Sequence, residues 1–177
     1  MDLNSWRSLT PEQARQKIRS GHTGTTSGWC DGWAQANLLA LPRDQAFDLM
    51  LFAQRNPKAC PLLDVFDPGA RSSTRFQGDI TTDVPAYRIY ERGELIDVSG
   101  VWRDDLVAFL FGCSFSFERA LTEAGIEMRH TTVESTVPMY RTTIECEPAG
   151  VFSSSMVVSM RGVPASRVAD AVRICAR

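Results

Sequence analysis

The sequence contains few of the residues that metal centres and disulfide frameworks require. It has two histidines, His22 and His130, and five cysteines without a CxxC pair. A multi-histidine metal site cannot be assembled from two histidines, and an odd number of widely spaced cysteines is not typical of a disulfide framework or a zinc knuckle. We therefore predict reduced thiols and assign no metal site. The acids Asp79 and Asp83 could bind Mg²⁺ or Mn²⁺, but such loop acids are more often turn formers. The cofactor, if one is used, is unknown from sequence.

A charge excess and long apolar runs are also missing. The 19 basic and 21 acidic residues give a net charge of -2, so the chain has no general attraction for nucleic acid or for an anionic membrane. No stretch approaches the roughly 20 apolar residues of a membrane helix, and the first residues lack the apolar core of a signal peptide. We expect a cytoplasmic protein that binds neither nucleic acid nor membrane. Its 177 residues suffice for a buried core.

Helix and strand signals alternate along the chain. Thr10 as N-cap, Pro11 at the first helical position and Gln13 as capping-box partner predict a helix that Gly21 ends. Other segments are expected as follows: helices over 42–57, 102–111, 117–125 and 164–176; strands over 60–66 and 156–163; a hairpin over 86–98 that turns at Arg92 and Gly93; and a strand pair over 131–147 broken at Pro138. This pattern indicates an α/β or α+β protein, either one compact unit or two lobes.

The stretch GCSFSFE, residues 112–118, joins an apolar run to a helix that begins with an acid. Ser114 or Ser116 can cap this helix, and backbone N–H groups at its start could bind a carboxylate or an oxyanion. In that setting Cys113 could act as a nucleophile and Glu118 as a proton donor. A buried cysteine and an ordinary capping serine explain the same residues, so both interpretations stay open.

Polar residues outside this turn form a second group of candidates. Arg55 and Asn56 end a predicted helix and could hold a carboxylate and an amine, although a helix C-terminus explains them as well. Asn37 lies in an apolar segment, where its amide needs either a ligand or backbone partners. Tyr140 and Arg141 could receive a dicarboxylate, with the histidine at 130 titrating in a useful range. A solvated strand would show the same residues.

Five blocks of sequence, in order along the chain, carry a family resemblance. They are QANLLALPRDQAFDLMLFAQRNPKACPLLDV, TTDVPAYRIYERGEL, WRDDLVAFLFGCSFSFERALTEAGIEMRH, VPMYRTTI and AGVFSSSMVVSMRGVP. Together they extend from about Trp33 to Ile174, which is most of the chain. The sequence resembles the YcsI-like family, whose members are called "putative hydro-lyases" and which includes the D-glutamate cyclase domain.

The resemblance implies a fold and an activity. The implied fold is a mixed α/β sandwich with a smaller two-layer α+β lobe. Within a single family domain we place the α/β lobe over 1–112 and the α+β lobe over 113–177. The implied activity is that of a hydro-lyase acting on a small amino acid or dicarboxylate, with D-glutamate closing to 5-oxo-D-proline as the leading case. For that chemistry the catalytic candidates are Cys113, Glu118 and His130, and the substrate-binding candidates are Asn37, Arg55, Asn56, Ser114, Ser116, Tyr140 and Arg141.

One departure from the family pattern keeps other functions open. Family members continue past the position of Arg177 into a segment rich in Gly, His, Pro and Asp, and we expect this sequence to lack that segment. If the segment completes the site, the alternative function is a catalytically inactive small-carboxylate-binding or regulatory protein. A third hypothesis is a structural partner of a polypeptide that supplies the segment, and a homodimer also stays open.

Overall fold

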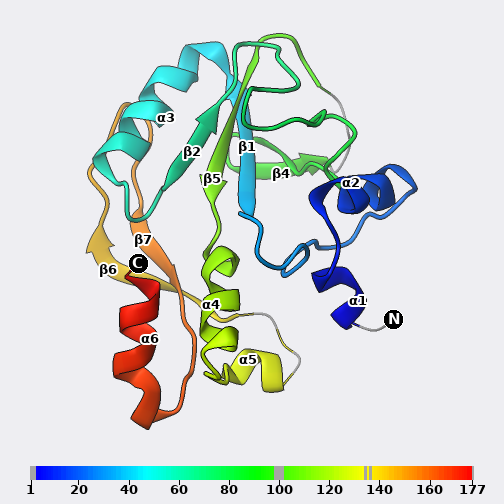
Figure 1. Ribbon diagram of the computed structural model, residues 1–177. Helices are drawn as coiled ribbons and strands as arrows, with labels where there is room; N and C mark the ends of the chain where they lie inside the picture. The colour runs from blue at the N-terminus through cyan, green and yellow to red at the C-terminus, as the bar shows by residue number, and fades with distance from the viewer. Residues whose placement is uncertain (1–2, 98–101, 134, 136, 177) are drawn as a thin grey trace. The chain divides into compact units, whose positions relative to one another are not determined.

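The computed structural model describes residues 3–97, 102–133, 135 and 137–176. The chain folds into two compact units, each assembled from three separate segments (Figure 1). Unit 1 consists of Met1–Trp33, Leu38–Ala46 and Asp64–Leu110, and unit 2 consists of Ala34–Asn37, Phe47–Leu63 and Phe111–Arg177. Helices and strands alternate in both units, so the mixed α/β class is confirmed. The lobe boundary at residue 112 stays a prediction.

The helices and strands follow one another along the chain in this order: α1 (Leu3–Arg7), α2 (Pro11–Arg19), β1 (Ala36–Pro42), α3 (Arg43–Arg55), β2 (Leu62–Val65), β3 (Ile89–Glu91), β4 (Glu94–Asp97), β5 (Leu106–Gly112), the 3₁₀ helix η1 (Ser114–Phe117), α4 (Glu118–Glu123), α5 (Arg129–Thr132), β6 (Met139–Glu145), β7 (Ser155–Ser159), the 3₁₀ helix η2 (Ala165–Arg167) and α6 (Val168–Cys175). Within the described residues, the structure contains no helix that is both long and apolar enough to cross a membrane.

The first strong sequence signal, the capping box of α2, is confirmed. The Thr10 hydroxyl accepts the backbone N–H of Gln13 at 3.3 Å, and the Gln13 side chain accepts the backbone N–H of Thr10 at 2.9 Å. Gly21 follows the helix with φ +106°, a backbone conformation that favours glycine. Local capping chemistry is therefore sufficient to fix both ends of this helix.

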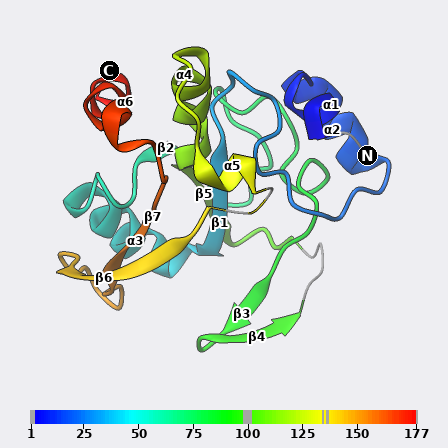
Figure 2. The same ribbon diagram turned by 90° about the horizontal axis from the view of Figure 1, so that it is seen from below.

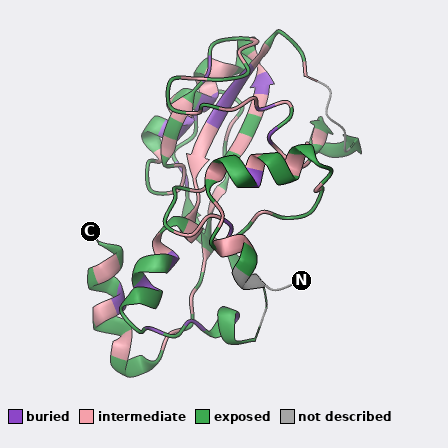
Figure 3. Ribbon diagram, turned by 45° about the vertical axis from the view of Figure 1, so that its right-hand side comes forward, coloured by how far each residue is buried: buried purple, intermediate pink, exposed green. Residues whose placement is uncertain are grey.

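The central sheet has three strands in the order β1–β5–β2. Its neighbouring strands run antiparallel, because residue numbers rise along one strand as they fall along the next. The bonds that show this join Arg43 to Asp105, Cys113 to Gln35, Phe66 to Ala108 and Gly69 to Leu106. The middle of β5 is the most deeply buried part of the sheet, where Val107, Ala108 and Phe109 are at most 5% exposed (Figure 3).

The helix predicted over 102–111 is wrong, because most of this segment forms β5. The run LVAFLFG has no polar position that would distinguish a buried helix from a strand buried on both faces. Its place between β1 and β2 decides the matter, since a central strand buries both faces and so can be apolar throughout. The core of unit 1 forms beside it from Phe66, Ile80 and Ala108.

A buried carboxylate attaches α2 to the turn at residues 79–83 in unit 1. The Asp83 side chain is fully buried and accepts hydrogen bonds from Arg19 Nε at 2.6 Å, from Arg19 Nη2 at 2.8 Å and from the Asp79 amide at 2.9 Å. Burial raises the pKa of Asp83, but the hydrogen bonds from Arg19, Asp79 and Thr82 and the charge of Arg19 outweigh it, so the net pKa is lowered. Arg15 adds a second guanidinium at 3.7 Å.

The predicted hairpin and its turn are confirmed by β3 and β4, which pair antiparallel and lie side by side (Figure 2). Arg92 and Gly93 both have positive φ, at 49° and 86°, as a two-residue hairpin turn requires. The last residue of the predicted hairpin, Val98, lies outside the described residues. Burial raises the pKa of Tyr87, just before the hairpin, and its hydroxyl donates to the Ile80 carbonyl at 2.6 Å.

The described residues of unit 2 form two small apolar cores. One joins α4 to α6 through Leu121, Ile126, Met128 and Ala171. The other joins α3 to the segment between β6 and β7 and contains Phe52, Cys146 and Ala149. Strands β6 and β7 form a separate antiparallel ribbon, whose residues are mostly exposed or half-buried.

The strand pair predicted over 131–147 is half wrong. Residues 139–145 form β6, but Arg129–Thr132 form the short helix α5. The β-branched residues Thr131 and Thr132 favour a strand by propensity. Tertiary contacts override it, since the Arg129 amide donates to the Gly162 carbonyl at 2.9 Å and His130 is buried. The remaining predicted elements are confirmed: strands β2 and β7, and helices α3, α4 and α6.

Candidate functional site

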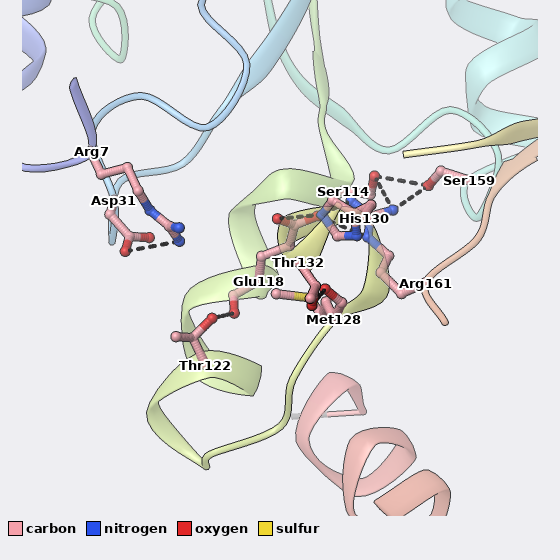
Figure 4. Close-up of polar contacts among 10 residues, drawn as sticks. All are labelled: Arg7, Asp31, Ser114, Glu118, Thr122, Met128, His130, Thr132, Ser159 and Arg161. Atoms are coloured by element: carbon pink, nitrogen blue, oxygen red, sulfur yellow. Dashed lines mark hydrogen bonds and ion pairs between the residues drawn. The ribbon is translucent and has the colours of Figure 1, made fainter. Parts of the chain in front are cut away.

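Five polar residues of unit 2 meet where η1, α4, α5 and the end of β7 lie close together (Figure 4). We call this set the Glu118 cluster: Ser114, Glu118, His130, Ser159 and Arg161. Three of its members, Ser114, Glu118 and His130, are candidates from the sequence. The other two, Ser159 and Arg161, are not.

The backbone after β5 brings Ser114 and Glu118 into the cluster. Cys113 is extended, with φ -108° and ψ 139°, and its N–H donates to the Gln35 carbonyl at 2.9 Å. The chain then turns into η1, where the Ser116 N–H donates to the Cys113 carbonyl at 3.1 Å. Four residues of 3₁₀ helix place Glu118 at the start of α4 with its side chain buried. A tight helical turn therefore positions an acid that an extended loop would leave in solvent.

Glu118 and Arg161 form a buried ion pair. Both side chains are at least nine-tenths buried, and Glu118 Oε1 accepts hydrogen bonds from Arg161 Nε at 2.9 Å and from Arg161 Nη2 at 2.5 Å. The guanidinium also lies near the rings of Phe115 and Phe117, at 5.4 and 5.0 Å from their centroids. The guanidinium supplies this buried carboxylate with both an opposite charge and hydrogen-bond donors. Glu118 is thereby better suited to orienting a neighbour than to donating a proton.

His130 is the neighbour that Glu118 faces. The ring is buried, and its Nε2 lies 3.3 and 3.4 Å from the two carboxylate oxygens of Glu118. The other ring nitrogen, Nδ1, is buried without a hydrogen-bond partner in the part of the chain that the structure describes. We call it the open nitrogen. A neutral ring facing a carboxylate places its proton on Nε2, because two acceptors would otherwise repel each other. The open nitrogen is then a bare acceptor.

The serines of the cluster hold the guanidinium from its other side. Arg161 Nη1 donates to Ser114 Oγ at 2.9 Å and to Ser159 Oγ at 2.5 Å, and the two hydroxyls lie 3.0 Å apart. Ser114 therefore does not cap the helix, contrary to the capping prediction. Ser116 does not cap it either, because its hydroxyl accepts the Gln35 amide at 2.9 Å. The N-cap positions of η1 and α4 are occupied by Cys113 and Phe117.

The turn at 112–116 offers less to an anion than the sequence led us to expect. Helix α4 has six residues, and the amides of Ser116 and Glu118 are bonded to the carbonyls of Cys113 and Phe115. Cys113 is a half-buried free thiol. Its role as a nucleophile stays a prediction.

Arg55 and Asn56 lie at the end of α3 and bind backbone rather than the Glu118 cluster. Arg55 Nη1 donates to the Pro148 carbonyl. The Asn56 side chain donates to the Glu147 carbonyl and accepts the Glu147 amide, each at 2.8 Å. These contacts fasten α3 to the segment between β6 and β7 and use the polar groups that were predicted to bind substrate.

Asn37, Tyr140 and Arg141 are exposed on strands. Asn37 belongs to β1, and Tyr140 and Arg141 lie on β6 opposite Val158 and Val157 of β7. The described contacts thus bring together three of the ten predicted site residues, and the arginines at 55 and 141 contribute none of those contacts. Among the described residues, one surface hollow of unit 1 is lined by residues 42–45, 103 and 105, and another by residues 9, 13, 16, 17 and 20. Neither contains a predicted site residue.

Sequence analysis missed Arg161 although a signal was present. It follows the apolar strand MVVSM by one residue, and an arginine at such a position must find a partner once its strand is packed. The partner, Glu118, is 43 residues away, so spacing alone could not identify it. Among the described residues, no group of three or more His, Cys, Asp or Glu side chains is arranged to hold a metal ion.

Comparison with known proteins identifies the relatives of the chain. The family model for D-glutamate cyclase matches residues 107–177, the part of the chain that contains the whole Glu118 cluster. The chain is 58% identical to a protein of Saccharopolyspora erythraea over 96% of its own length and 68% of the relative's length. It is 55% identical to a protein of Mycolicibacterium gilvum, with 99% and 68% covered, and 51% identical to one of Clostridium beijerinckii, with 94% and 66% covered.

Each of these three relatives carries the name "Putative hydro-lyase". The chain spans about two thirds of the length of each relative, and the similarity extends across nearly all of the chain. Identity above one half over this extent cannot arise from a shared motif alone. The chain therefore belongs to the D-glutamate cyclase-like family of hydro-lyases.

Proposed function

We propose that the chain is a hydro-lyase that acts on a small amino acid or dicarboxylate, and that D-glutamate, closing to 5-oxo-D-proline, is its substrate. The observation that carries the proposal is the buried pair of Glu118 and His130 with the open nitrogen. A carboxylate that orients one nitrogen of a histidine while the other is free to accept a proton is a recurring arrangement in acid–base catalysis.

The reaction needs proton transfer at two atoms. The substrate amine, freed of one proton, attacks the γ-carboxyl carbon, and the C–N bond forms. The amine nitrogen gives up a second proton as it becomes the ring amide. One γ-carboxyl oxygen takes up both protons and leaves as water when its C–O bond breaks. His130 receives a proton at the open nitrogen and returns it to the departing oxygen, while Glu118 stabilises the charged ring.

The remaining roles fall to residues outside the Glu118 cluster. Arg161 already donates to Glu118, Ser114 and Ser159, so the α-carboxylate of the substrate falls to an exposed guanidinium, and Arg141 is the candidate for it. Cys113, which the sequence suggested as a nucleophile, lies half-buried beside Ser114 and receives no step in this reaction. Cyclisation by the substrate's own amine needs no enzyme nucleophile, so a Cys113→Ala variant should keep most of its activity.

The test is a product assay with matched variants. Purified chain is incubated with D-glutamate, and formation of 5-oxo-D-proline is followed by chromatography together with loss of primary amine. We expect turnover that is lost in His130→Gln and kept in His22→Gln, since His22 lies in unit 1 and its Nε2 contacts the Thr25 carbonyl. L-Glutamate serves as the stereochemical control. Equal product from wild type and His130→Gln, or none from either, would contradict the proposal.

The same samples distinguish the alternative of a binding or regulatory protein. A small dicarboxylate that binds the native state raises the melting temperature by mass action. Stabilisation by D-glutamate without its consumption would favour that alternative.

A further inference from the structure

We infer that Arg161 is a positioning residue that, through Glu118, fixes the ring of His130 so that Nδ1 is its bare acceptor nitrogen. The inference rests on the proposed function, because it explains how that nitrogen is kept ready to receive a proton. Arg161 itself does not hold a substrate carboxylate, because its side chain is only 7% exposed and is bonded to other residues of the protein.

The guanidinium is held on several sides. Four of its five N–H groups are used: Nε and one Nη2 proton bond Glu118 Oε1, and Nη1 bonds the hydroxyls of Ser114 and Ser159. The rings of Phe115 and Phe117 lie near its centre and restrict its tilt. The plane and position of the guanidinium are therefore determined by three elements, η1, α4 and the end of β7.

The position of the guanidinium determines which hydrogen bond Glu118 needs from His130. The carboxylate already has a full positive charge beside it, so a neutral imidazole can satisfy its remaining acceptor site with one N–H. If the guanidinium were absent, Glu118 would be a buried carboxylate with His130 as its nearest charge partner. A carboxylate that Arg161 no longer fixes would accept a hydrogen bond from either ring nitrogen, so Nδ1 would carry the proton in part of the molecules.

The histidine side chains report this state directly. In protein labelled with ¹⁵N in the histidine rings, we expect the wild-type His130 to show a protonated Nε2 and an unprotonated Nδ1 by NMR near neutral pH. In Arg161→Gln the Nδ1 signal should move toward that of a protonated nitrogen. Arg161→Lys, which restores the charge without the planar fork, should give an intermediate spectrum. Arg173→Gln, which removes an exposed arginine of α6, is the matched control and should leave the His130 signals unchanged.

The readout separates positioning from a purely structural role. Loss of a structural ion pair lowers the melting temperature but leaves the ring signals of the remaining folded molecules in place, so spectra are compared well below the melting temperature of each variant. Identical Nδ1 signals in folded wild type and folded Arg161→Gln would overturn the inference. So would a wild-type spectrum with the proton on Nδ1. If Arg161→Gln does not fold, the wild-type spectrum and that of Arg161→Lys still decide the matter.

Failure of this inference and failure of the proposed function are distinguishable. The NMR measurement needs no substrate, so the expected spectra without turnover of D-glutamate would remove the proposed substrate and leave the positioning role. Turnover of D-glutamate together with identical Nδ1 signals in wild type and Arg161→Gln would remove the positioning role and leave the proposed substrate. With turnover present, kcat of Arg161→Lys should fall by about 10–100-fold, as is typical when a supporting group behind a functional side chain is lost, with a much smaller change in KM.

Discussion

Unit 1 and unit 2 each contain a buried carboxylate paired with arginine, and the two differ in what else the carboxylate touches. The oxygens of Asp83 accept hydrogen bonds from the guanidinium of Arg19 and from the Asp79 amide, and each of these donors has its partner there. Glu118 shares its oxygens between Arg161 and a histidine whose second nitrogen is the open nitrogen. Native proteins pair nearly all buried polar atoms, so an exception in one cluster and not in the other is informative. The satisfied cluster is explained by stability alone, and the unsatisfied one needs a further reason.

The arginines of the two clusters differ as well. The Arg19 side chain is 48% exposed, whereas that of Arg161 is 7% exposed. Water can replace part of what Arg19 provides but little of what Arg161 provides. Burial of a complete ion pair has a desolvation free energy that apolar residues of similar size would avoid. Stability alone therefore explains the Glu118 cluster poorly.

The largest expected effect tests the structural side of this comparison. Asp83→Ala removes a fully buried carboxylate and leaves the Asp79 amide and two arginines without their acceptor. We expect the free energy of unfolding to fall by roughly 3 kcal/mol, the lower end of the range for breaking a buried ion pair, because Arg19 can be rehydrated. Urea denaturation measures it. A change below about 0.5 kcal/mol would show that the pair is dispensable.

The second effect tests the functional side. Glu118→Gln keeps the shape of the side chain but removes the charge that holds His130 and balances Arg161. We expect kcat to fall by roughly 100-fold, the lower end of what acid–base groups contribute. Asp83→Asn is the matched control, and its activity per folded molecule should equal that of the wild type. If the two amide variants lose activity equally, the contrast between the clusters has no functional meaning.

A smaller effect is expected at the serine that steadies Arg161. Ser114→Ala removes an acceptor for Nη1 and a hydrogen-bond partner of Ser159. Stability should fall by about 1–2 kcal/mol, since the lost bond involves a charged donor. Thermal unfolding followed by circular dichroism measures it. The exposed Ser166→Ala is the control, and a loss as small as that of the control would argue against a held guanidinium.

Acid should weaken unit 1 through Asp83. Its folded pKa lies below its ordinary value, so its contribution is fully present above the ordinary carboxyl pKa of about 4 and is lost as the pH falls through the lower folded pKa. The unfolding free energy of the wild type should therefore decline more steeply below about pH 4 than that of Asp83→Asn. Parallel pH profiles of the two proteins would contradict this.

The smallest effect sets the baseline for both clusters. Arg119 and Glu123 form an ion pair on the exposed face of α4, with side chains 51% and 61% exposed. Glu123→Gln should change stability by only about 0.3–0.5 kcal/mol, and high salt should remove most of the difference. A loss comparable to that of Asp83→Ala would mean that ion pairs in this protein cannot be ranked by burial.

Local chemistry made part of this structure predictable. The capping box at Thr10 and Gln13, the positive-φ turn at Arg92 and Gly93, and the end of α4 before Gly125 depend on neighbouring residues, and all three are confirmed. The sequence did not show that residues 106–112 form a strand, because that depends on β1 and β2 lying on either side of them. The same holds for α5, whose residues favour a strand until Gly162 and Glu118 are placed beside them.

The site was predictable to a similar extent. Ser114 and Glu118 were identified from the turn at 112–118, and His130 was identified from its place near Tyr140 and Arg141 in the sequence. Arg161 was not, because its importance comes from one contact across the fold. Arg55 and Asn56 matched the chemistry of a carboxylate site, but backbone carbonyls accept the same donors, and the segment between β6 and β7 supplies them. Residue type indicates what a side chain can bind but not which partner reaches it first.

The distance along the chain between Glu118 and Arg161 has a consequence for how the protein is made. After the ribosome has incorporated Glu118, it must add another 43 residues before Arg161 is present. At ordinary translation speeds this takes on the order of several seconds, which is long compared with the closing of a helix. Throughout that interval the newborn α4 segment carries an unneutralised acid on the side that will face inward, so its burial must wait for the arrival of β7. The histidine ring is thus fixed only after residue 161 has been added, and a nascent chain that stalls earlier would lack the Glu118–Arg161 pair.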